Sequence, residues 1–101
     1  MDRLRTAELT AVDAFARGAA RELEWHDINA MVGICAEAAR AGIGIEAAAA
    51  CELATKHLAE DFERFRRTGK MGTTGPGLQA YRDVFQFMVL QRQSITEGKK
   101  P

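Results

Sequence analysis

The sequence lacks long hydrophobic runs and an excess of charge of either sign. No apolar stretch approaches the roughly 20 residues that a membrane-spanning helix needs, and residues 1–10 mix both charges without the apolar centre of a secretory signal. Lys plus Arg and Asp plus Glu number 14 each, so the net charge is zero. Nucleic-acid binders usually carry positive charge, because phosphate contacts supply much of their affinity. These absences favour a cytoplasmic protein with no membrane contact.

Cysteines and strand patterns are scarce as well. Cys35 and Cys51, the two cysteines, fall within helical patterns, and we expect both to be reduced and buried. Val and Ile are sparse and do not alternate with polar residues, so no strand is expected. No internal repeat or long linker divides the 101 residues, which predicts a single domain. The high content of Ala, Arg and Gly is typical of GC-rich bacterial genomes.

What the sequence does contain is helical periodicity. Apolar residues recur at steps of three and four in four segments, which predict helices over residues 6–22, 27–41, 45–67 and 76–93. A mobile tail is expected at 96–101. Because the connections are short, the pattern predicts an all-α fold, a compact bundle of about four helices with mostly antiparallel neighbours.

Local signals mark the ends of these helices. Asp27 is suited to cap the second helix, and Pro76 is suited to open the fourth. Gly42 and Gly69 are expected to end the second and third helices in the left-handed conformation. Trp25 lies between the first two predicted helices, so we expect its large side chain to anchor their corner.

The one glycine-rich run of the chain is GKMGTTGPG, residues 69–77. It differs from a nucleotide-binding P-loop, because its lysine precedes most of its glycines and the preceding element is a predicted helix. A turn between two helices explains the run. An alternative keeps a small-anion site at the start of the fourth helix, formed by Lys70, Thr73, Thr74 and Gly75.

A second alternative is nucleic-acid binding around Gly42. Ala38, Gly42 and Ile43 occupy the relative positions that a helix-turn-helix favours. The helix after the turn should then present base-reading side chains in its first turns. No Arg, Lys, Asn or Gln occurs in this helix before Lys56, so the expected donors are missing. A helical hairpin packed through alanines explains the same residues, and DNA binding is possible but not favoured.

Residue types suited to metal binding or catalysis occur without the required spacing. His26, Cys35, Cys51 and His57 lack the close pairs that form zinc sites. His57 and Asp61 lie one helical turn apart, but we expect an ordinary surface pair, since no nucleophile motif accompanies them. We therefore expect no metal, no cofactor and no catalytic residue, hence a non-enzymatic protein.

The stretch most informative about function is FQFMVLQRQ, residues 85–93. Its apolar residues occupy more than one side of the predicted helix. One apolar stripe suffices for the core of a monomer, so the surplus side, with Phe87 and Leu90, is expected to meet a partner. Arg64, Arg67 and Lys70 are expected to form a polar rim to this surface. The sequence thus predicts a protein that acts through protein–protein contact, as a homodimer or an accessory subunit.

Overall fold

The computed structural model describes the backbone of residues 2–98 and the side chains of residues 7–93. It contains the helices α1 (Asp2–Ala16), α2 (Glu22–Arg40), α3 (Ala48–Thr68) and α4 (Gly75–Gly98), with a short 3-10 helix η1 (Ile45–Ala47) before α3. No strand occurs within residues 2–98, so the predicted all-α bundle is confirmed. None of the helices in this range combines the length and the apolar character needed to cross a bilayer.

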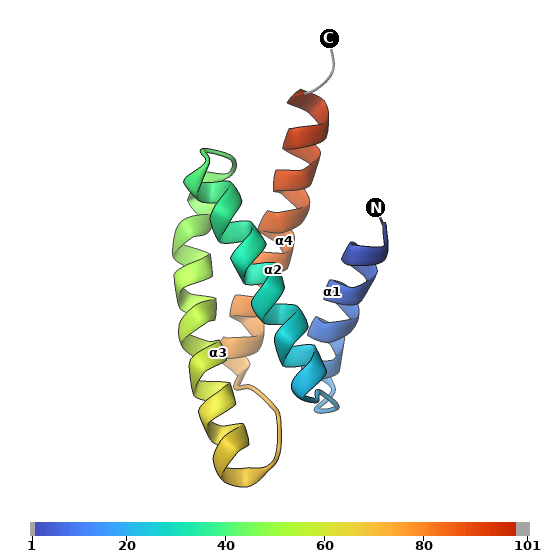
Figure 1. Cartoon of the computed structure of the whole chain (residues 1–101), viewed down its shortest axis with the longest axis vertical. Coiled ribbons are helices and arrows are strands. Elements are labelled where there is room, and N and C mark those ends of the chain that lie inside the picture. Colours follow the sequence, from blue (N-terminus) through green and yellow to red (C-terminus); the bar gives the residue numbers. More distant parts are fainter. Residues whose placement is uncertain (1, 99–101) are drawn as a thin grey trace.

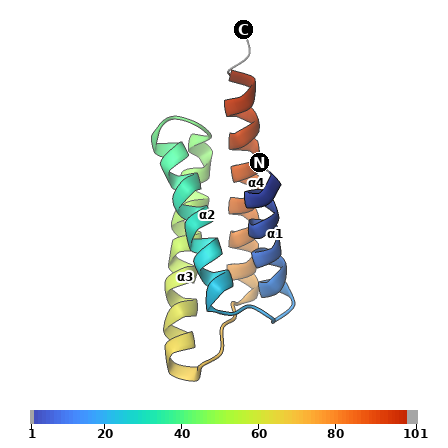
Figure 2. The same cartoon turned by 45° about the vertical axis from the view of Figure 1, so that its right-hand side comes forward.

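The four helices form an elongated bundle that measures 52 × 25 × 18 Å. Successive helices run in opposite directions (Figure 1). α2 and α4 contact each other, while α1 and α3 each pack against both of them. The C-terminal part of α4 rises past the turn between α2 and α3, so it projects beyond these two helices in both views (Figures 1 and 2).

The core is built from aliphatic, sulfur-containing and aromatic side chains of all four helices. Its largest fully buried apolar members are Ile28, Met31, Cys35, Tyr81, Val84 and Met88. The ring of Phe15 on α1 meets the ring of Tyr81 on α4 edge-on, with 5.4 Å between the centroids. Cys35 and Cys51 are buried as free thiols, as the sequence predicts.

The first connection differs from its prediction. α1 ends at Ala16 because Gly18 takes a left-handed conformation with φ of 69°, which breaks the helix. α2 begins earlier than expected, since the carboxylate of Glu24 accepts the backbone N–H of Arg21 at 2.8 Å and caps the first turn. Asp27 therefore lies inside α2, and its predicted role as the cap was wrong.

Trp25 anchors a different pair of helices from the pair expected. It lies in the first turns of α2, where its indole N–H donates to the backbone oxygen of Leu58 on α3 at 2.9 Å. Its ring also packs against Phe62, with 4.7 Å between the centroids. Trp25 thus joins α2 to α3 rather than holding the corner between α1 and α2.

The predicted ends of α2 and α3 are confirmed. Gly42 has a φ of 92°, and the N–H of Ile43 reaches back to the oxygen of Ala38 at 2.8 Å. This is the backbone pattern with which a left-handed glycine closes a helix. Gly69 has a φ of 75°, and its N–H donates to the oxygen of Phe65 at 2.8 Å.

The start of α4 also follows its prediction, but its end does not. Pro76 lies in the first turn, and the hydroxyl of Thr74 accepts the N–H of Gly77 at 3.1 Å, as a capping residue does. α4 then continues past the predicted end at residue 93. Of the expected mobile tail, residues 96–98 are helical, while residues 99–101 lie outside the described part of the chain.

Candidate functional site

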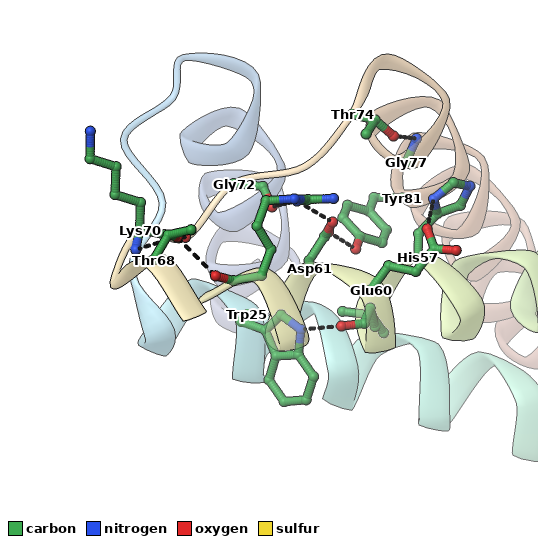
Figure 3. A network of polar contacts seen from close by, with 12 residues as sticks. Trp25, His57, Glu60, Asp61, Thr68, Lys70, Gly72, Thr74, Gly77 and Tyr81 are labelled. Atoms are coloured by element: carbon green, nitrogen blue, oxygen red, sulfur yellow. Dashed lines mark hydrogen bonds and ion pairs between the residues drawn. The ribbon is translucent and has the colours of Figure 1, made fainter. Parts of the chain in front are cut away.

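A buried polar cluster links α3, the connection after it and α4 (Figure 3). Asp61 on α3 is only 1% exposed, and one of its carboxylate oxygens accepts the hydroxyl of Tyr81 on α4. Its other oxygen accepts a hydrogen bond from Arg64 at 3.2 Å, and Arg64 also donates to the backbone oxygen of Gly72 at 3.3 Å. The cluster thus holds three consecutive segments of the chain together.

The electrostatics of this cluster suit a structural bond better than catalysis. Burial, followed by the hydrogen bond to Asp61, raises the pKa of Tyr81. The phenol therefore remains a protonated donor at neutral pH. Both oxygens of Asp61 already accept hydrogen bonds, so neither residue presents a free base or nucleophile.

Sequence reasoning missed this cluster because it paired Asp61 with His57 on the surface. Asp61 is buried and turns toward Tyr81 instead. The nearest carboxylate to His57 is that of Glu60, 3.5 Å from its Nδ1 atom. The expected surface pair was therefore wrong. A signal was present, since Asp61 lies three residues after the buried Leu58 and so falls on the inward side of α3.

Gly77 lies where the connection after α3 packs against the first turn of α4. A Cβ atom at position 77 would lie 2.1 Å from the hydroxyl of Thr73 and 3.4 Å from Nδ1 of His57. These two buried atoms have no hydrogen-bond partner among the described residues. The connection after α3 therefore packs closely on the first turn of α4, so a side chain at position 77 would force the hydroxyl of Thr73 to move.

The residues of the predicted anion site are partly brought together. A hollow of about 450 Å³ lies against the connection between α3 and α4. It is lined by Arg64, Thr68, Lys70, Met71, Gly72, Thr73 and Thr74. Lys70, Thr73 and Thr74 thus line one hollow, whereas Gly75 begins α4 beside it.

This hollow has few donors to offer an anion. Pro76 has no N–H group, and the N–H of Gly77 is taken by Thr74. Arg64 is already bonded to Asp61, and the side chain of Lys70 extends away from the cluster (Figure 3). Anion affinity at a helix start depends on several free N–H groups, which the first turn of α4 does not provide.

A second feature is the apolar surface of α4, formed by Phe87 and Leu90. Phe87 is half-buried, whereas Leu90 is 56% exposed. Both line a hollow of about 160 Å³ whose other walls are Gly44, Glu46 and Gln91. The two residues that the sequence singled out therefore share one concave surface, between α4 and the turn that precedes α3.

The expected arginine rim does not belong to this surface. Arg64 and Arg67 lie in the last turns of α3, at the end of the bundle opposite to the α2–α3 turn (Figure 1). The hollow beside Phe87 and Leu90 lies at that turn. Since α3 runs down the length of the bundle, the two arginines are too far along it to surround this surface.

Gln91 fixes which side of α4 faces outward, and sequence reasoning missed it. It is buried, and its amide donates to the backbone oxygens of Cys35 at 3.2 Å and Ile43 at 3.0 Å. Gln91 continues the inward stripe of Val84 and Met88, so its spacing was the available signal. Its neighbour Leu90 is consequently turned toward solvent.

Comparison with protein-family models, curated proteins and solved structures found no significant match. The arrangement of the side chains is therefore the basis for any proposal about function. Within the described residues, no three His, Cys, Asp or Glu side chains gather where they could hold a metal ion. The apolar surface of α4 is one described feature that core packing leaves unexplained. Another is a hollow of about 470 Å³ lined by residues of α2, η1 and α3, among them Ala36, Ala39 and Ile45.

Proposed function

We propose that this protein functions through protein–protein contact, as a homodimer joined by the apolar surface of α4. The observation that carries the proposal is the 56% exposure of Leu90 beside the half-buried Phe87 and a hollow. Exposed apolar side chains that adjoin a concave surface are typical of contact sites. The protein would act by assembly and not by chemistry of its own.

The other exposed large apolar side chains are Leu9, Leu23, Ile34, Ile45 and Leu53. Of these, Ile45 also lines a hollow, of about 470 Å³, whose other apolar walls are mostly alanines. Single exposed leucines and isoleucines are common on folded proteins and need no explanation. Leu90 differs because a second large apolar side chain, Phe87, lies one turn away on the same helix and lines the same hollow.

Charge favours a second copy as the partner. Residues 84–91 contain no charged side chain. In a two-fold symmetric contact the same patch of each copy meets itself, so any charge near the axis would approach its own kind. The α4 side of this surface avoids this repulsion, while Glu46 is the one charged residue that lines the adjoining hollow.

Light scattering at several protein concentrations tests the proposal. We expect a mass of twice the 11.1 kDa of one chain, falling to a single chain in Leu90→Glu. Leu53→Glu is the matched control, because Leu53 is a helical leucine of similar exposure, 49%. A dimer that persists in Leu90→Glu would reject this surface, and a single chain at every concentration would reject the homodimer.

Nucleic-acid binding remains the alternative that the sequence raised. The exposed side chains at the start of α3 include Glu46, Ala48 and Glu52, which offer no donor to bases or phosphates. Retention on a heparin column that falls steeply with salt would support this alternative, since phosphate binding releases counterions.

A further inference from the structure

The antiparallel pairing of α2 and α3 brings Cys35 and Cys51 to the same level of the bundle. Trp25 on α2 contacts Leu58 and Phe62 on α3. Cys35 lies ten residues after Trp25, while Cys51 lies seven residues before Leu58 and eleven before Phe62. Each residue of a helix advances the chain by about 1.5 Å, and the two helices run in opposite directions. The two cysteines therefore lie level to within a single helical turn.

Both cysteine side chains are turned into the core at this level. Cys35 is 0% exposed and Cys51 is 3% exposed, and both are free thiols. The backbone oxygen of Cys35 accepts the amide of Gln91 at 3.2 Å, and that of Cys51 accepts the hydroxyl of Thr55 at 2.8 Å. Burial, followed by a hydrogen bond with Cys51, raises the pKa of the Cys35 thiol to about 12. The two sulfur atoms are thus neighbours, and Cys35 stays protonated at neutral pH.

Only one of the two thiols borders a hollow that a small molecule can enter. Cys51 lines the hollow of about 470 Å³ between α2, η1 and α3, whereas Cys35 does not. Other walls are Ala36, Ala39 and Ala48, whose small side chains leave the space open. A water molecule occupies roughly 30 Å³ in the liquid, so a molecule as small as hydrogen peroxide fits easily. An oxidant that enters therefore meets Cys51 before Cys35.

From this arrangement we infer that hydrogen peroxide converts Cys35 and Cys51 into a reversible disulfide between α2 and α3. The sulfur of Cys51 attacks one peroxide oxygen, the O–O bond breaks, and the products are a sulfenic acid and one water, which takes the thiol proton. The sulfur of Cys35 then attacks that of Cys51. The S–S bond forms, the S–O bond breaks, and hydroxide leaves as a second water with the proton of Cys35. The two thiols lose two electrons, and the peroxide gains them.

This disulfide would act as a redox-dependent brace of the α2–α3 hairpin. It closes the chain around the turn between the two helices, which restricts the unfolded chain and so favours the folded one. A dithiol reductant restores both thiols by exchange. The inference goes beyond the proposed contact at α4 and does not depend on it, because both cysteines lie in the core of one copy.

Counting the thiols of the unaltered full chain tests the inference. The folded protein is treated with dilute hydrogen peroxide and then unfolded in excess iodoacetamide, beside a sample reduced with dithiothreitol. We expect two alkyl groups on the reduced chain and none on the oxidised chain. Proteolysis of the oxidised chain should release the peptide of Cys35 bound to that of Cys51. The midpoint of thermal unfolding should be higher for the oxidised chain, and an unchanged midpoint would overturn the bracing role.

Single variants test the order of the two steps. In Cys35→Ala, dimedone, which reacts with sulfenic acids, should label Cys51. In Cys51→Ala, Cys35 should keep its thiol, and dimedone on Cys35 would overturn the assigned order. For the unaltered chain, two alkyl groups after peroxide would overturn the disulfide. A link found only between two chains on a non-reducing gel would overturn it as well. Since these last measurements need no substitution, a variant that fails to fold does not affect them.

Discussion

At the scale of single residues, the contact between Tyr81 and Asp61 gives the protein a defined sensitivity to alkali. Burial and the bond to Asp61 raise the pKa of Tyr81, whereas a tyrosine in the unfolded chain ionises at about pH 10. Above that pH the unfolded chain loses its proton while the folded chain retains it. The free energy of unfolding should therefore fall with rising pH, by up to about 1.4 kcal/mol per unit from this residue.

The measurement is selective because Tyr81 is the only tyrosine in the chain. Tyrosinate absorbance should appear together with the loss of helical circular dichroism, not before it. In Tyr81→Phe this part of the pH dependence should vanish, and the stability at pH 7 should fall by about 1–3 kcal/mol, because buried Asp61 loses a donor. Tyrosinate formed near pH 10 in a fully helical protein would contradict the assignment.

The buried carboxylate of Glu8 lowers the stability of the folded protein at neutral pH. Its side chain is buried near Arg92, and its Oε1 atom accepts no hydrogen bond from a described residue. Burial raises the pKa of Glu8, Arg92 partly lowers it, and Asp27 raises it further. Because the pKa of this carboxyl is higher in the folded protein than in the unfolded chain, the group contributes its full stability below the unfolded-state pKa. This contribution is lost as the pH rises through the folded-state pKa.

Glu8→Gln should therefore stabilise the protein at pH 7, by on the order of 1 kcal/mol, because it removes the buried charge and preserves the shape. Below about pH 4 it should match the unaltered chain, in which Glu8 is then protonated. Urea unfolding at both pH values measures the difference. Glu63→Gln, an exposed change, should have little effect at either pH. A less stable Glu8→Gln at pH 7 would show that the pairing with Arg92 outweighs the cost of burial.

At the scale of the helices, apolar periodicity predicted the existence of all four, because this signal is repeated over several turns. The ends were harder to predict. Gly42 and Gly69 were recognised as terminators, but the first helix was expected to continue to residue 22, whereas Gly18 ends it in the same left-handed conformation. The start of α2 depends on Arg21, which is not among the preferred capping residues.

The candidate site was also predictable only where the signal lies within one helix. Phe87 and Leu90 were singled out because a surplus of apolar residues is visible within one helix. Asp61 and Tyr81 lie 20 residues apart on different helices. Their contact depends on how α3 and α4 pack, which local spacing does not specify. The placement of Arg64 away from Leu90 was missed for the same reason.

At the same scale, two helical glycines should respond in opposite ways to replacement by alanine: Gly33 within α2 and Gly77 in the first turn of α4. Gly33→Ala should stabilise the protein by about 1 kcal/mol, because alanine favours helices and the new Cβ would meet no side chain and no other part of the bundle within 4 Å. Gly77→Ala is also a helical substitution, but its Cβ would lie 2.1 Å from the hydroxyl of Thr73. We expect a loss of about 1–3 kcal/mol from this overpacking.

Chemical unfolding of the two variants tests this contrast. Thr73→Ala combined with Gly77→Ala should restore part of the lost stability, since the crowding oxygen is removed. Equal effects of the two glycine substitutions would show that helix propensity, and not the packing of the connection on α4, decides the outcome at position 77.

At the scale of the whole molecule, assembly should be coupled to stability. A dimer that forms only between folded chains shifts the folding equilibrium by mass action. Each tenfold rise in protein concentration should therefore raise the midpoint of thermal unfolding, Tm, by a few degrees, on the order expected for a domain of about 100 residues. A monomeric bundle would unfold at the same Tm at every concentration.

Thermal unfolding monitored by circular dichroism, over a hundredfold range of protein concentration, provides the measurement. Leu90→Glu should make Tm independent of concentration, because the buried glutamate prevents pairing while each separate bundle keeps its core. Leu53→Glu should retain the concentration dependence, since Leu53 does not line the hollow. A constant Tm in the unaltered chain would contradict the homodimer even if Leu90→Glu altered other properties. A dependence that survives in Leu90→Glu would locate the dimer contact elsewhere on the bundle.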